Sequence, residues 1–98
     1  MTFHASSEAE KDYVDAVSYY LEEDTPRTAE RFSNALANSY REIKAIPLLF
    51  AADKDGTRRK PIKGFPEHSV MYRVKENVIE IIAIRHHKRK PGFWMYRL

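Results

Sequence analysis

Six side chains in the C-terminal half of this 98-residue sequence are of types that could act on a phosphate ester. They are Arg59, Arg85, His86, His87, Arg89 and Tyr96. Cleavage of an RNA backbone by its own 2′-hydroxyl needs a base for that proton, cations for the charged intermediate and an acid for the leaving oxygen. Histidine titrates near neutral pH, and arginine holds phosphate through forked hydrogen bonds. These residues are therefore the candidates for an endoribonuclease site.

The same residues also have a structural interpretation. His86 ends a predicted strand, where it can pack or hydrogen-bond, and the arginines can form a solvated surface or a patch that binds a partner. A metal site is not expected, because consecutive residues on a strand, such as His86 and His87, point to opposite faces. Nothing in the sequence indicates a cofactor. No catalytic residue is assigned on the sequence alone.

Charge is distributed unevenly along the chain. Residues 1–57 carry 6 Lys and Arg against 11 Asp and Glu, whereas residues 58–98 carry 11 against 3. The small overall net charge of +3 therefore hides a strongly basic C-terminal half. Such asymmetry favours a polyanionic or acidic partner. The alternative is a solvated strand surface whose charge balances the acidic helices.

Length and composition indicate one small domain, residues 1–98. An apolar share of 43% is ordinary for a globular protein. No apolar stretch approaches the roughly 20 residues that a membrane span needs, and the N-terminus lacks the layout of a signal peptide. Without cysteine there is no disulfide scaffold and no thiolate metal site. We therefore expect a cytoplasmic protein that does not associate with membranes.

Apolar residues at helical spacing predict a helical hairpin over about residues 7–47. The first helix, about 7–22, is expected to begin with a capping box formed by Ser7 and Glu10. The second follows Thr25 as N-cap and Pro26 at its first position, and it ends at Pro47. Residues 1–5 are short enough to form an edge strand before the hairpin.

From Arg58 onward the pattern changes to strands, which predicts a basic sheet over about residues 58–87 and a tail over 88–98. A short strand covers 58–63, and Gly64 to Pro66 is expected to interrupt the run. Strands at 68–75 and 78–86 are separated by Glu76 and Asn77, which predicts a tight hairpin. This register places Arg73 opposite Glu80 and Met71 opposite Ile82.

Both faces of the predicted hairpin carry apolar side chains. One face is expected to hold Val70, Tyr72, Val74, Ile79, Ile81 and Ala83, and the other Ser69, Met71, Ile82, Ile84 and His86. The helices can cover only one face, so the second needs the tail, another subunit or a partner. Trp94 is favoured to close the core over the sheet, while Arg97, next to the chain end, receives no role. The fold class is α+β: an N-terminal strand, then a two-helix antiparallel hairpin packed on a small, twisted, mainly antiparallel sheet.

The order of several short motifs resembles the RelE/ParE superfamily of toxins from type II toxin–antitoxin systems. The matching residues are Ala9-Glu10-Lys11-Asp12, Tyr19-Tyr20, Ala29, Phe32, Pro47, Gly64-Phe65-Pro66, Val70-Met71-Tyr72-Arg73-Val74, Ile84 to Pro91, Trp94 and Arg97. His86, Arg89 and Pro91 resemble the ParE or plasmid-stabilisation branch, which is linked with growth inhibition through DNA gyrase. The RelE branch cuts messenger RNA on the ribosome. Its pattern has an arginine where this chain has Ser69, and a tyrosine where this chain has Phe93.

The resemblance implies a toxin neutralised by a cognate antitoxin, with DNA gyrase or the ribosome as the target. Surface residues expected to bind the antitoxin or the target are Met71, Arg73, Ile82, Ile84, Arg85, His86, Arg89 and Trp94. The outer groove of the helical hairpin is a second place for an antitoxin arm. A homodimer and a hetero-oligomer with the antitoxin remain open, and so does a non-toxic module that binds nucleic acid.

Overall fold

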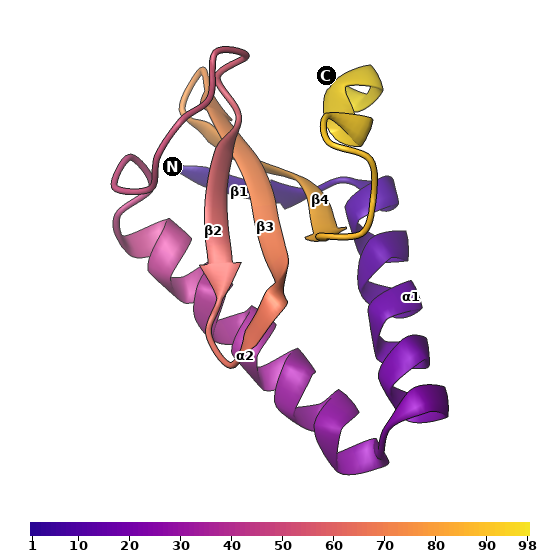
Figure 1. Ribbon diagram of the computed structural model, residues 1–98. Helices are drawn as coiled ribbons and strands as arrows, with labels where there is room; N and C mark the ends of the chain where they lie inside the picture. The colour runs from indigo at the N-terminus through magenta and orange to yellow at the C-terminus, as the bar shows by residue number, and fades with distance from the viewer.

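The computed structural model describes all 98 residues and follows the predicted order of elements. The chain forms β1 (Thr2–Ala5), α1 (Ser7–Glu23), α2 (Pro26–Ala45), β2 (Arg58–Ile62), β3 (Phe65–Lys75), β4 (Val78–His86) and a 3-10 turn, η1 (Phe93–Arg97). The strands form one sheet in the order β1-β4-β3-β2, in which β1 runs parallel to β4 and the other neighbours are antiparallel. The predicted α+β class, with a helix pair on a mainly antiparallel sheet, is confirmed (Figure 1).

The two helices begin at polar caps. Thr25 caps α2 as predicted, because its hydroxyl accepts the Thr28 N–H at 3.1 Å and Pro26 follows it. The predicted cap of α1 is wrong by one residue: the hydroxyl that accepts the Ala9 N–H, at 3.1 Å, belongs to Ser6 and not to Ser7. Ser6 stays extended because its own N–H donates to the Ile81 carbonyl and prolongs the pairing of β1 with β4.

The hairpin of β3 and β4 has the predicted turn. Glu76 and Asn77 both have positive φ, 50° and 64°, as a two-residue turn of this hand requires. Beyond the turn Arg73 lies opposite Glu80, and its Nε donates to the carboxylate at 2.8 Å. This part of the predicted register is confirmed.

Farther along the hairpin the predicted register is wrong, because β4 contains a bulge. Met71 lies opposite Ala83 and Tyr72 opposite Ile81, so Ile82 is an extra residue with no partner on β3. A bulge interrupts the alternation of side chains. Ile82 and Ala83 both pack in one cluster with Met71, while Ile84 belongs to the cluster that faces the helices. Ala83, which was predicted to share a face with Tyr72 and Ile81, therefore lies on the opposite face with Met71. Ile84, which was predicted to lie with Met71, lies toward the helices.

The start of β3 also differs from the prediction, since the strand begins at Phe65 and not at His68. The turn before it consists of Lys63 and Gly64, and the φ of 85° at Gly64 is easily reached only by glycine. Pro66 is tolerated in the strand because it has no partner in either ladder.

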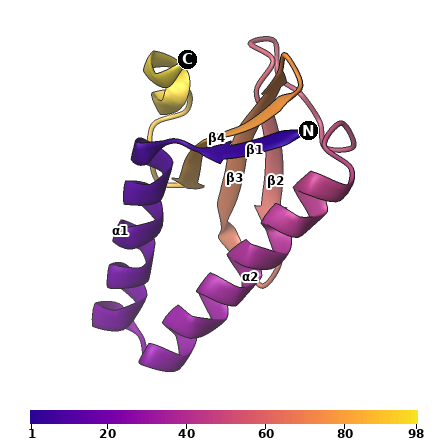
Figure 2. The same cartoon turned by 180° about the vertical axis from the view of Figure 1, so that it is seen from behind.

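The sheet separates two apolar clusters. The inner face, toward the helices, holds the larger cluster, in which Phe32 and Ile43 from α2 and Tyr72 and Ile81 from the sheet are completely buried. Seen from behind, α1 and α2 form the two arms of a V below β1 (Figure 2). The outer face holds a small cluster of Met71, Ile82 and Ala83 beneath Trp94 of the tail. Of the three expected covers for the second face, the tail is the one observed. None of the helices is long and apolar enough to cross a lipid bilayer.

Trp94 is 7% exposed, so its removal tests whether the tail closes the outer face. We expect Trp94→Ala to lower the free energy of unfolding by about 3 kcal/mol, because it uncovers Met71, Ile82 and Ala83. Urea denaturation measures this. The control is Tyr96→Ala, which removes a 72% exposed ring from the same turn and should change stability by less than about 0.5 kcal/mol. Equal stabilities of the two variants would contradict this packing.

Candidate functional site

Two arginines and a serine lie side by side on the outer face, across three strands. Ser69 on β3 is paired with Arg85 on β4, and its buried hydroxyl accepts the Nε–H of Arg59 on β2 at 3.2 Å. The Arg85 guanidinium lies 5.5 Å from the Trp94 ring, and its buried Nε has no hydrogen-bond partner. Two cations beside one hydroxyl can hold an anionic group. Arg59 and Arg85 are called the arginine pair below.

His86 is separated from the arginine pair by the sheet. Its ring centroid lies 4.8 Å from that of His68, which packs edge-on against Phe32 in the inner cluster. The Nδ1 of His86 accepts the Lys88 N–H at 3.0 Å, so in the neutral ring the hydrogen is on Nε2, 3.6 Å from the Glu67 carboxylate. The structure therefore does not bring His86 together with the two arginines expected beside it in a nuclease site.

The other three candidates for catalysis are dispersed. His87 is exposed just past β4, where its backbone N–H donates to the Glu67 carbonyl at 2.8 Å. The guanidinium carbon of Arg89 lies 3.7 Å from the ring centroid of Phe93, and the same group forms an ion pair with Asp12 at 3.3 Å. Tyr96 is exposed on η1, far along the tail. The six residues thus occupy several places, and only Arg59 and Arg85 converge.

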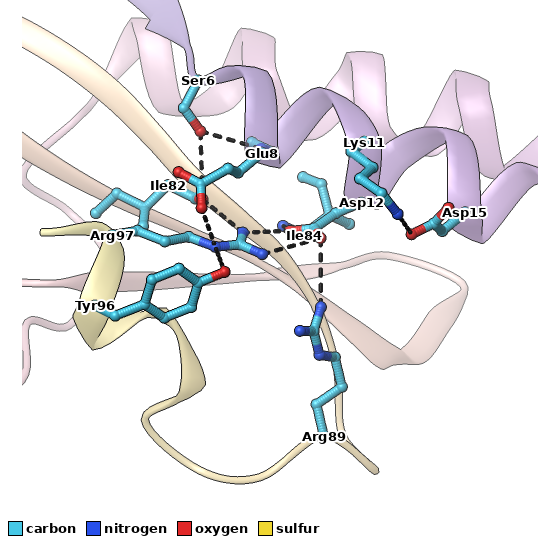
Figure 3. Close-up of polar contacts among 11 residues, drawn as sticks. Ser6, Glu8, Lys11, Asp12, Asp15, Ile82, Ile84, Arg89, Tyr96 and Arg97 are labelled. Carbon is cyan, nitrogen blue, oxygen red and sulfur yellow. Dashed lines mark hydrogen bonds and ion pairs between the residues drawn. The ribbon is translucent and has the colours of Figure 1, made fainter.

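The most buried ion pair in the molecule was not predicted from the sequence. Arg97, given no role at the chain end, is 6% exposed in its side chain and forms a 2.7 Å ion pair with Asp12, which is 5% exposed. It also donates to the Ile82 carbonyl at 3.0 Å and lies 3.5 Å from the Glu8 carboxylate (Figure 3). We call this contact the Asp12–Arg97 clamp. It is hard to find because the two residues are 85 positions apart.

Asp12 accepts hydrogen bonds from three residues, one on β4 and two in the tail. Besides Arg97 it accepts the backbone N–H of Ile84 at 3.1 Å and a guanidinium N–H of Arg89 at 3.3 Å. Burial alone would lower the pKa of Arg97, but its hydrogen bonds to Asp12 and Tyr96 and the charge of Asp12 raise the pKa above its ordinary value. The Arg97 end of the clamp therefore keeps its positive charge. The clamp holds α1, β4 and the tail together.

The apolar residues expected to bind a partner are not on the free surface. Met71 and Ile82 are buried beneath the tail, Ile84 is buried against the helices, and Trp94 is itself the cover. The earlier expectation of one open face carrying Met71, Ile82 and Ile84 is therefore wrong, because the bulge turns Ile84 inward and Trp94 closes the remainder. The partly exposed members of the expected set are Arg73, Arg85, His86 and Arg89.

Two of the grooves on the surface flank α1. One, of about 320 Å³, lies between α1 and the end of β4 and has mixed charge, with Asp15, His86, Lys88 and Arg89 in its walls. The other, of about 270 Å³, lies between α1 and α2 and is mostly apolar. Its lining residues are Ala5, Glu10, Tyr13, Ser33, Leu36, Ala37 and Tyr40. We call the second one the hairpin groove.

Two helices packed on a four-stranded mixed sheet match the fold of small toxins of the RelE/ParE kind. The family model for the ParE toxin of the type II toxin–antitoxin system parDE matches residues 4–91. The chain therefore belongs to the ParE toxin family.

Solved structures give the same fold at low sequence identity. The chain is similar to one in the chromosomal ParDE toxin–antitoxin system from P. aeruginosa, with a TM-score of 0.77, 18% identity, and coverage of 88% of this chain and 95% of that one. It is also similar to a chain of the YoeB-YefM complex from Staphylococcus aureus, with a TM-score of 0.57, 18% identity, and coverage of 89% and 97%. No curated protein sequence matches the chain.

Breaking the Asp12–Arg97 clamp should destabilise the fold. We expect Arg97→Met to lower the free energy of unfolding by about 3 kcal/mol, because the buried Asp12 loses its closest charged partner. Thermal and urea denaturation measure the change. Lys11→Ala, which breaks the adjacent but exposed ion pair with Asp15, is the matched control and should cost less than about 0.5 kcal/mol. The prediction fails if the two losses are alike.

Stability should fall as the solution becomes mildly acidic, because His68 is buried. Burial, with the nearby charge of His86, lowers the pKa of His68 to about 4, and the charge of Glu67 only partly opposes this. The unfolded chain then binds a proton that the folded chain excludes, so stability is complete above the ordinary pKa of about 6.5 and is lost below it. From pH 7.5 to pH 5 we expect a loss of about 2 kcal/mol from this group.

Denaturation at several pH values tests this assignment with two variants. His68→Gln should flatten the pH dependence, while His87→Gln, which changes an exposed ring, should leave the slope unchanged. Tyr20, whose hydroxyl lies 3.1 Å from the Nδ1 of His68, stays protonated throughout because burial raises its pKa to about 12. An unchanged slope in His68→Gln would refute the assignment.

Proposed function

We propose that this chain is the toxin of a type II toxin–antitoxin pair and that it arrests growth by binding DNA gyrase without catalysis. Membership of the ParE toxin family provides the class. The observation that carries the choice of action is the position of His86, which lies across the sheet from Arg59 and Arg85. A nuclease needs its base within hydrogen-bond reach of the proton that it removes. The arginine pair is placed to bind an anionic surface of a large target.

The proposed partner that neutralises the toxin is a cognate antitoxin. Its support comes from the solved relatives, which are titled as toxin–antitoxin systems and complexes. The hairpin groove offers an extended arm a concave, mostly apolar surface edged by Glu10 and Ser33. The basic C-terminal half would attract acidic side chains of the same arm. We place the pair in the cytoplasm, with gyrase.

A ribosome-dependent endoribonuclease is the second candidate, and the arginine pair beside Ser69 is the observation that favours it. His87 lies two residues after Arg85, just past the end of β4, and its side chain is exposed. If the chain cuts RNA, His87 is therefore the expected base and His86 is not. This assignment gives the two candidates different mutational signatures.

The test is inducible expression of the full chain without an antitoxin, with growth, DNA topology and message integrity followed together. We expect growth arrest with gyrase-linked DNA breaks or loss of supercoiling, and we expect it to persist in His86→Ala and His87→Ala because no proton transfer is involved. Arg59→Ala combined with Arg85→Ala should relieve the arrest, because the anion-binding pair is lost. Lys11→Ala is the matched control for a lost surface charge.

Two outcomes would overturn the proposal. Message cleavage that disappears in His87→Ala but persists in His86→Ala would favour the ribonuclease. Normal growth at confirmed soluble expression, with nucleic-acid binding that weakens steeply with salt, would favour the non-toxic module.

A further inference from the structure

The tail presents three apolar side chains to water at the end of a basic segment. Met95, Tyr96 and Leu98 are 57%, 72% and 40% exposed, and we call these three residues the tail knob. The segment that carries them has five cations and no acidic residue. They are Arg85, Lys88, Arg89, Lys90 and Arg97. Exposed apolar side chains grouped together mark an interaction surface.

The knob is held in place, unlike most chain ends. Trp94 and Arg97 alternate with the knob residues and point inward, one onto the outer cluster and the other into the Asp12–Arg97 clamp. Arg97 also orients the aromatic member of the knob, because its Nε donates to the Tyr96 hydroxyl at 3.2 Å (Figure 3). Two inward anchors thus fix the direction in which Tyr96 and its neighbours face.

The turn is fixed at its start as well. Gly92 has a φ of 78°, and the Met95 sulfur lies 3.3 Å from the place that a Cβ there would occupy. The Met95 N–H donates to the Gly92 carbonyl at 3.0 Å. The backbone of Met95 therefore has a defined position, so little backbone entropy remains to be lost when the knob binds.

We propose that the tail knob is the element of this chain that inserts into the toxin's target, at an apolar pocket rimmed by acidic residues on a folded protein. This inference rests on the proposed function, with gyrase as that target. A convex, fixed projection fits the pocket of a folded partner, whereas an extended arm needs a groove such as the one between α1 and α2. Tyr, Met and Arg are the residues enriched in the centres of protein interfaces. Lys88 and Lys90, which are exposed and form no ion pair within the chain, match an acidic rim.

The experiment compares binding of the full chain and two double variants to purified DNA gyrase, together with inhibition of supercoiling. Met95→Ala combined with Tyr96→Ala removes the knob, and we expect about tenfold or greater loss of gyrase affinity and inhibition. Leu48→Ala combined with Leu49→Ala is the matched control. It removes two exposed apolar side chains, 62% and 64% exposed, at another place and should change binding less than about twofold.

Stability and growth measurements make every outcome informative. Denaturation tests whether the knob variant is folded, and we expect it to be, because the side chains that it loses are exposed. If the unaltered chain binds gyrase and the folded knob variant binds equally well, the inference is wrong and the proposed function stands. If the unaltered chain does not bind gyrase, the proposed function fails. In that case, the inference that the tail knob binds the target is supported only if the folded knob variant no longer arrests growth. The inference is overturned if growth arrest persists.

Discussion

The buried pair of Asp12 and Arg97 is the contact on which the arrangement of the remaining parts depends. A carboxylate in a helix that faces the sheet is costly unless donors surround it, and here the donors come from Ile84 on β4 and from Arg89 and Arg97 in the tail. Because Arg89 and Arg97 must reach the buried Asp12 carboxylate, the last ten residues of the chain fold back along the sheet. Without that return Trp94 would have no reason to lie over Met71 and Ile82.

The bulge at Ile82 makes this return possible, because it supplies two consecutive residues of β4 to the outer cluster. Its carbonyl also accepts from Arg97 at 3.0 Å, so the bulge contributes a side chain and a backbone acceptor to the closure of the outer face. The same irregularity returns Ile84 to the helices and leaves Arg85 outward with Ser69 and Arg59. One extra residue thus turns the imidazole of His86 away from Arg59, whereas Arg85, its neighbour on β4, would point to the opposite face from His86 in any register. This separation argues against acid–base chemistry at the outer face.

Local patterns in the sequence were sufficient for the features that depend on neighbours along the chain. Helical spacing, the cap at Thr25 and the turn at Glu76 and Asn77 are short-range effects, and all are observed. The register beyond Arg73 was missed because a bulge has no consistent signature in apolar alternation. Arg97 was missed because its role comes from a partner 85 residues earlier, and only folding brings the two together. The arginine pair could be predicted by residue type, but the faces on which Arg85 and His86 lie depended on the bulge.

The free edges of the sheet indicate how partners can approach the outer face. On β2 the outward N–H of Arg59 already donates to the Ala51 carbonyl at 3.2 Å, and Pro61 has no N–H to offer. The Pro61 carbonyl accepts the Lys60 ammonium at 2.6 Å. These three features make the β2 edge unable to pair regularly with another strand, and natural sheets use such features to avoid aggregation. A partner that reaches the outer face from this side must therefore recognise side chains, and those within its reach are guanidinium groups and the apolar residues that the tail displays.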